Sequence, residues 1–189
     1  TMTNQMLFEE YRRSLKMTEA EEILDLVFYR PIAFLFVKSI YRLPITPNQV
    51  TVLSLIAGLL AAWYFALATG TALLAAALWY VVANIFDCSD GQLARLQNSG
   101  TLHGRVVDGA VDYISTIAIF LGIGVGLSGS GQEIWLLVVA AGISSAIHAI
   151  FFDHYQSEFI STVRAENNFL EREIERFTAE VRSMETRPG

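Results

Sequence analysis

Hydrophobic and polar positions alternate in long blocks along this chain. Apolar residues dominate residues 50–68, 72–86, 106–127 and 134–152, and short polar turns separate these blocks. A helix needs about 20 mostly apolar residues to cross the roughly 30 Å hydrocarbon core of a bilayer. The second block is the shortest, but it continues without a turn into a polar motif. We therefore predict four transmembrane helices in an all-α integral membrane protein.

A weaker helical pattern precedes these blocks. Residues 18–43 carry apolar side chains at helical spacing, interrupted by Pro31 and by the basic Lys38, and Thr18 with Glu21 matches a capping box at the start. The stretch is too short and too interrupted to cross a bilayer. We predict an amphipathic juxtamembrane helix that lies in the membrane interface.

The first predicted span has a clear start signal. In Thr46-Pro47-Asn48-Gln49, a threonine N-cap is followed by proline at the first helical position and by glutamine three residues after the cap. The chain then divides into four predicted parts: a polar N-terminal segment (1–17), the interfacial helix (18–43), a membrane core (44–155) and a polar cytoplasmic helical segment (156–189). The last part carries a short apolar stripe at Leu170, Ile174, Phe177 and Val181.

Basic residues test the topology of the four spans. Of 13 lysines and arginines, six precede the first span, two lie between spans two and three, and five follow span four. All of them fall on one side of a four-span arrangement, and the two opposite turns hold none. By the positive-inside rule, both ends of the chain and the polar motif face the cytoplasm of a cytoplasmic (inner) membrane.

Composition agrees with this class of protein and excludes others. The hydrophobic fraction is 53% and the mean hydropathy is +0.41, well above soluble composition. The net charge of −6 disfavours nucleic-acid binding. Cys88 is the single cysteine, so this chain forms no internal disulfide and no thiolate zinc site, and its neighbours include no base that would activate it.

Four aspartates interrupt the apolar pattern after the second block. Asp87 and Asp90 are three residues apart, and Asp108 and Asp112 are four apart, so each pair shares one helix face. A short turn would bring the four carboxylates together, and like charges so close repel unless cations lie among them. Hard oxygen ligands of this kind suit Mg²⁺ or Mn²⁺, one or two ions, shared with substrate phosphates. Ionised aspartate inside a bilayer is costly, which places the cluster near the interface or in a wet cavity.

A second motif has a simpler interpretation. Gly124, Gly126 and Gly129 match the spacing of a dinucleotide-binding fingerprint, but no strand precedes them. We interpret these glycines as helix-packing and turn positions.

The spacing of the aspartate motif resembles the signature of the CDP-alcohol phosphotransferases. Every position matches: Asp87-x2-Asp90-Gly91-x2-Ala94-Arg95-x8-Gly104-x3-Asp108-x3-Asp112. The stretch from Pro47 to Thr51 also resembles the entry of that family into its first membrane helix. The resemblance covers roughly residues 30 to 155.

The resemblance implies an enzyme that transfers a phosphoalcohol, such as a phosphatidyl group from CDP-diacylglycerol, to an acceptor alcohol with release of CMP. Asp87, Asp90 and Asp108 would hold the cations, and Asp112 would complete the metal shell and act as general base. Contacts to the CDP moiety are implied for Asn48, Gln49, Val50, Thr51, Gly91, Arg95 and Thr101. Implied partners are the CDP-linked donor, an acceptor alcohol, membrane lipid and a second copy in a homodimer, which the small residues of the third span permit.

Two features leave the substrate open. Members of the family typically have six spans, so the resemblance implies a further C-terminal pair, absent here, that would help to close the acceptor pocket. The end of the fourth predicted span reads Asp153-His154-Tyr155-Gln156, with no arginine until Arg164, which disfavours a phosphorylated acceptor bound at that end of the span.

Two alternative functions are an intramembrane prenyltransferase with metal–diphosphate chemistry, and a cation or metabolite transporter.

Overall fold

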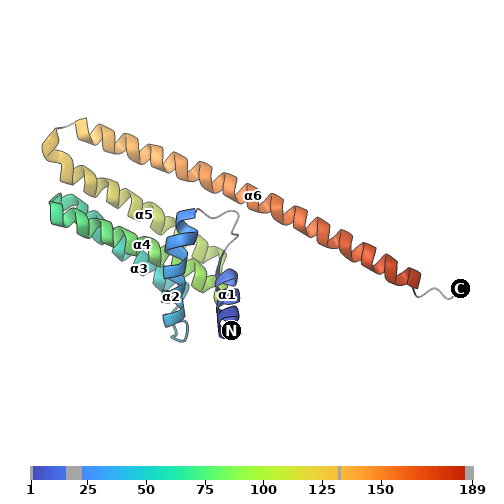
Figure 1. The fold of residues 1–189 in the computed structure, drawn as a ribbon. Helices are drawn as coiled ribbons and strands as arrows, with labels where there is room; N and C mark the ends of the chain where they lie inside the picture. Colours follow the sequence, from blue (N-terminus) through green and yellow to red (C-terminus); the bar gives the residue numbers. More distant parts are fainter. Residues whose placement is uncertain (1, 16–22, 132, 186–189) are drawn as a thin grey trace. The chain divides into compact units, whose positions relative to one another are not determined.

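The structure, a computed structural model, describes residues 2–15, 23–131 and 133–185, with side chains for 8–15, 23–129, 131, 134–163, 165 and 166. These residues form helices and no strand, which confirms the all-α prediction (Figure 1). The predicted capping box of Thr18 and Glu21 lies outside the described residues. The chain divides into two compact units, residues 1–146 and 147–189.

Four helices are long and apolar enough to cross a membrane, as predicted. They are α3 (Pro47–Leu67), α4 (Gly70–Leu96), α5 (Leu102–Leu127) and the stretch Ile134–Val163 of α6 (Glu133–Glu185). Helix α6 continues past the predicted end of the fourth span at residue 152 and through the predicted polar segment, because neither proline nor glycine interrupts residues 143–185. The side chains of the predicted stripe from Leu170 to Val181 lie outside the described ones.

Three shorter elements precede the membrane core. The polar segment 1–17 contains a helix, α1 (Met2–Ser14), that the sequence analysis did not expect. The predicted interfacial helix comprises a π-helical turn, η2 (Asp25–Tyr29), and α2 (Arg30–Ile40). Pro31 does not end this helix: it directly follows the π-helical turn, and the helical backbone continues through it.

The local start signals act as predicted. The backbone N–H of Thr46 donates to Oε1 of Gln49 at 3.0 Å, Thr46 itself is extended, and Pro47 opens α3. At the next turn, Oγ1 of Thr69 accepts from the backbone N–H of Ala72 at 3.3 Å. These side chains satisfy backbone donors that the first turn of a helix leaves without partners, so they define where each span begins.

Helix α3 packs against both α4 and α5, and small residues let the three helices approach closely (Figure 1). A Cβ added at Gly58 would lie 2.8 Å from Oγ of Ser115, and one added at Gly122 would overlap the carbonyl oxygen of Ala62. Ser54 contributes a buried hydrogen bond from its hydroxyl to the carbonyl of Ala83, at 3.1 Å. Close backbone approach through small residues is the usual way in which membrane helices pack.

Two of the three glycines of the dinucleotide-like pattern also serve packing. A Cβ at Gly124 would come within 2.7 Å of the Trp135 ring, and one at Gly126 would overlap the carbonyl oxygen of Phe65. This confirms Gly124 and Gly126 as packing positions, whereas Gly129 lies in the short 3₁₀ turn Ser128–Ser130 with open space around it. The homodimer that the small residues of the third span permit stays a prediction.

An apolar cluster joins α2 to the membrane helices beside the aspartate motif. Its members are Val37 and Ile40 of α2, Val50 of α3 and Leu93 of α4, and all are buried. Leu93 lies three residues after Asp90, so this cluster holds the polar half of α4 against α2 and α3.

Candidate active site

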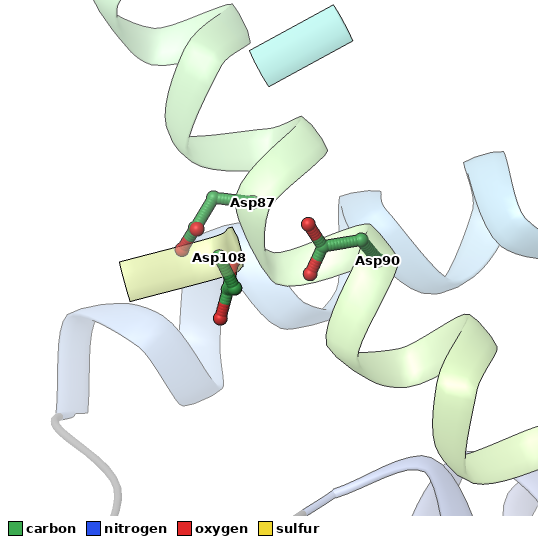
Figure 2. A group of neighbouring side chains, drawn as sticks. All are labelled: Asp87, Asp90 and Asp108. Carbon is green, nitrogen blue, oxygen red and sulfur yellow. The ribbon is translucent and has the colours of Figure 1, made fainter. Parts of the chain in front are cut away.

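The four aspartates come from two helices that meet at one turn. Asp87 and Asp90 lie near the C-terminal end of α4, and Asp108 and Asp112 lie near the N-terminal end of α5. Figure 2 shows Asp87 and Asp90 projecting from α4 toward Asp108. The turn between the helices is short because α4 ends at Leu96 and α5 begins at Leu102. The predicted juxtaposition is present.

Three of the four carboxylates form a compact group. Asp87, Asp90 and Asp108 each offer an oxygen within 4.8 Å of the other two. Asp112 adjoins Asp87 at the edge of this group. Asp90 is buried and Asp87 and Asp108 are half-buried, whereas Asp112 is exposed. The cluster therefore has a closed side, formed by three carboxylates, and an open side at Asp112.

The donor set fits a hard divalent cation. Oδ1 of Asp108 is buried and has no hydrogen-bond partner among the described residues, so its lone pairs are available to a cation. Three carboxylates this close repel one another in the absence of positive charge. Carboxylate oxygens are the ligands that Mg²⁺ and Mn²⁺ prefer.

Thr51 supports this group from α3. Its hydroxyl donates to Oδ2 of Asp90 at 2.5 Å, a length typical of a hydrogen bond to a carboxylate, and both side chains are buried. Thr51 was predicted to contact the CDP moiety. In the structure, its hydroxyl is directed to Asp90, so it supports the group of three aspartates from α3.

Gly91 and Arg95 lie together, one turn apart on α4. The guanidinium of Arg95 folds back over Gly91, where a Cβ would be 3.4 Å from Nη2. Its Nε donates to the carbonyl oxygen of Ser14, at the end of α1, at 2.5 Å. A Cβ at position 91 would be in ordinary van der Waals contact with this guanidinium.

Asn48 and Thr101 form a second group across the α4–α5 turn. A Cβ at Gly104 would lie 3.3 Å from Oδ1 of Asn48 and 3.2 Å from Oγ1 of Thr101, so both polar groups border this glycine. Thr101 also caps α5, because its Oγ1 accepts from the N–H of Gly104 at 3.0 Å. Asn48 and Thr101 are exposed, and they remain candidates for contact with a ligand.

The two remaining predicted CDP contacts serve the fold. The side chain of Gln49 caps α3 through the N–H of Thr46. Val50 is fully buried in the apolar cluster with Val37 and Leu93. The valine side chain is enclosed by other apolar residues, so the predicted contact of Val50 with the CDP moiety stays a prediction for its backbone.

Sequence reasoning missed two neighbours of the aspartates. Gln92, inside the motif, is fully buried, and its amide donates to the carbonyl oxygen of Arg30 at 3.0 Å. The positive charge of Arg30 in turn acts on Asp87. A glutamine among aspartates and an arginine just before an apolar helix were available signals, but neither indicates its partner 62 positions away.

Comparison with known proteins places these residues in a family. Residues 44–163 match the CDP-alcohol phosphatidyltransferase family. Over 95 residues the chain is 38% identical to a phosphatidylinositol phosphate synthase from Corynebacterium glutamicum. That match spans 50% of this chain and 40% of the length of the synthase. Because the family match covers more than half of the chain and contains all four aspartates, this chain belongs to the CDP-alcohol phosphatidyltransferase family.

Proposed function

We propose that the protein transfers a phosphatidyl group from CDP-diacylglycerol to an acceptor alcohol and releases CMP. The observation that carries this proposal is the asymmetric aspartate cluster, in which three carboxylates converge and Asp112 borders them on the open side. The family match supports the same chemistry.

The proposed cofactor is Mg²⁺ or Mn²⁺, as one or two ions, held by Asp87, Asp90 and Asp108 with Asp112 at the edge. When bound, such a cation neutralises charge on the donor diphosphate and makes CMP a better leaving group. Thr51 keeps the carboxylate of Asp90 in place by its hydrogen bond, so that the acidic group is organised before the donor arrives.

Asp112 is proposed as the general base because it is the accessible member of the cluster. A carboxylate oxygen of Asp112 takes the proton of the acceptor hydroxyl as that oxygen bonds to the phosphorus bearing the diacylglycerol. The bond from this phosphorus to the bridging oxygen breaks, and CMP leaves with the bond electrons. A carboxylate is a weak base for an alcohol, so the proton must move as the new bond forms, which requires close positioning.

Two groups of residues are proposed to bind the CDP moiety. The guanidinium of Arg95 offers a planar fork of donors suited to phosphate oxygens, and Gly91 leaves room for it. Asn48 and Thr101 border Gly104 on the other side of the α4–α5 turn and present exposed polar atoms.

The protein is a multi-pass membrane protein, and we propose that its active site faces the cytoplasm of an inner membrane. Arg95 near the end of α4 and Arg105 near the start of α5, together with the basic residues before α3, support this orientation by the positive-inside rule. A site at this interface lets a soluble acceptor meet a donor whose acyl chains stay in the bilayer.

The test is CMP release from CDP-diacylglycerol by the purified protein with Mn²⁺, comparing inositol phosphate, inositol, glycerol phosphate and serine as acceptors. We expect CMP release with one of these acceptors, and the Asp112→Asn variant should lower the rate about 10²- to 10⁴-fold, the usual contribution of a general base.

Glu166→Gln, at an exposed position of α6 outside the cluster, is the matched control and should keep the parent rate. A correctly folded Asp112→Asn variant with the parent rate would remove the assigned base. Prenyl transfer, or ion flux in proteoliposomes without any CMP release, would replace the proposed reaction by one of the two alternatives.

A further inference from the structure

Helix α1 ends against a residue of the aspartate motif, although α1 lies outside the family match at residues 44–163. The carbonyl oxygen of Ser14, the last residue of α1, accepts a hydrogen bond from Nε of Arg95 at 2.5 Å. Ser14 is fully buried and Leu15 is 7% exposed, so this end of α1 is enclosed by the rest of the first unit. The contact joins residues 81 positions apart.

Independent contacts hold the end of α1 in this place. The rings of Tyr11 and Phe34 meet edge to face with centroids 5.3 Å apart, and Phe34 is buried in α2. The hydroxyl of Tyr11 donates to the carbonyl oxygen of Leu26 at 3.4 Å. Glu10 forms an ion pair with Lys38 on the next turn of α2. The position of Ser14 is thus specified by the last two turns of α1.

A helix C-terminus suits a guanidinium for two reasons. Its last carbonyl oxygens have no partner within the helix, and the helix dipole makes that end negative. A guanidinium is a rigid planar fork, so one hydrogen bond at Nε sets the direction of the whole group. Here the bond to Ser14 accompanies a guanidinium whose Nη1 and Nη2 lie over Gly91.

We propose that α1 is a positioning element of the nucleotide site: its C-terminal carbonyl orients Arg95 to receive the diphosphate of a CDP-linked donor. This inference rests on the proposed function, in which Arg95 contacts the CDP moiety. Orienting the side chain in advance reduces the entropy that binding must otherwise remove. Ser14 and Tyr11 act through Arg95 and do not touch the donor themselves.

The test measures the affinity of the purified protein for CDP in the presence of Mn²⁺, by isothermal titration calorimetry. Tyr11→Ala removes the ring that holds α1 on Phe34, and we expect it to weaken CDP binding about 3- to 10-fold, the cost of immobilising one flexible side chain. Glu10→Lys should act in the same direction, and adding Lys38→Glu should restore affinity by reversing the ion pair. Phe8→Ala, an exposed aromatic residue on α1, is the matched control and should leave CDP affinity unchanged.

A double-mutant cycle separates positioning from general stability. In an Arg95→Ala background, Tyr11→Ala should cause no further loss of CDP affinity, because the residue that α1 orients is gone. A further loss of CDP affinity in the Arg95→Ala background would overturn the role of α1. Parent CDP affinity in both Tyr11→Ala and Glu10→Lys, with weak binding in Arg95→Ala alone, would overturn it as well. Either result leaves the proposed function intact. Parent affinity in Arg95→Ala itself would instead overturn the assignment of Arg95, and the inference with it. If Tyr11→Ala fails to fold, the Glu10 and Lys38 charge swap gives the same comparison at exposed positions.

Discussion

The hydrogen bond from Thr51 to Asp90 provides the sharpest test of how the fold prepares the acidic cluster. Thr51→Val keeps the branched shape of the side chain and removes only the hydroxyl. The bond is 2.5 Å long and joins two buried side chains, so its loss leaves a carboxylate with one donor fewer in a place that water does not readily reach. The same hydroxyl also lies 3.2 Å from the carbonyl oxygen of Pro47, but the bond to Asp90 is shorter and its acceptor is charged, so the substitution acts chiefly on the support of Asp90.

The expected size follows from the charge on the acceptor. Hydrogen bonds to charged groups contribute about 1.5–3 kcal/mol, and each 1.4 kcal/mol corresponds to about tenfold in an equilibrium constant. Because a bound cation needs Asp90 ionised and correctly placed, most of this loss should appear as weaker metal binding. We expect the dissociation constant for Mn²⁺ to rise about 10- to 100-fold, the range seen when a residue supporting a metal ligand is removed.

The assay is Mn²⁺ titration of the purified protein, followed by electron paramagnetic resonance of the free ion, with CMP release against Mn²⁺ concentration as a second readout. Ser54→Ala is the matched control, since Ser54 lies three residues further along α3, is equally buried and loses a hydrogen bond to the carbonyl of Ala83. It should leave Mn²⁺ affinity unchanged. Parent Mn²⁺ affinity in Thr51→Val, or an equal loss in Ser54→Ala, would refute the reasoning.

Three further predictions test the cation, the packing and the topology. Saturating Mn²⁺ should raise the melting temperature by about 5 °C, since ligand at 100 times its dissociation constant adds about 2.7 kcal/mol of stability. The Asp90→Asn variant should show no such rise. An unchanged melting temperature in the parent protein would contradict a cation site. Gly122→Ala should lower the free energy of unfolding in detergent by about 1–3 kcal/mol, because its Cβ would overlap the carbonyl oxygen of Ala62. Gly109→Ala, on the same helix with open space around it, is the control and should leave stability unchanged. Equal stability of the two variants would contradict the packing. In a Cys88→Ser background, an impermeant maleimide should label Ser128→Cys in intact spheroplasts and Ser99→Cys only after permeabilisation, and the reverse pattern would invert the proposed orientation.

The sequence by itself determined the membrane helices and the identity of the acidic cluster. Hydrophobic blocks and caps such as Thr46 with Gln49 are local, so they can be interpreted without knowing what packs against what. The same holds for the spacing of Asp87, Asp90, Asp108 and Asp112, which puts each pair on one helix face whatever surrounds it. The helix α1 escaped this reasoning because its residues are polar and show no clear apolar stripe.

Only the tertiary structure decided which residues act together. Thr51 meets Asp90 across 39 positions, and Ser14 meets Arg95 across 81, because α3 and α1 pack against the same polar half of α4. Neither distance along the chain nor residue type signals such a meeting. Packing also separated the members of one motif, since it enclosed Val50 in the apolar cluster and left its neighbour Asn48 exposed. Helix periodicity assigns a side chain to a face, but only the neighbouring helices decide whether that face is core, support or open site.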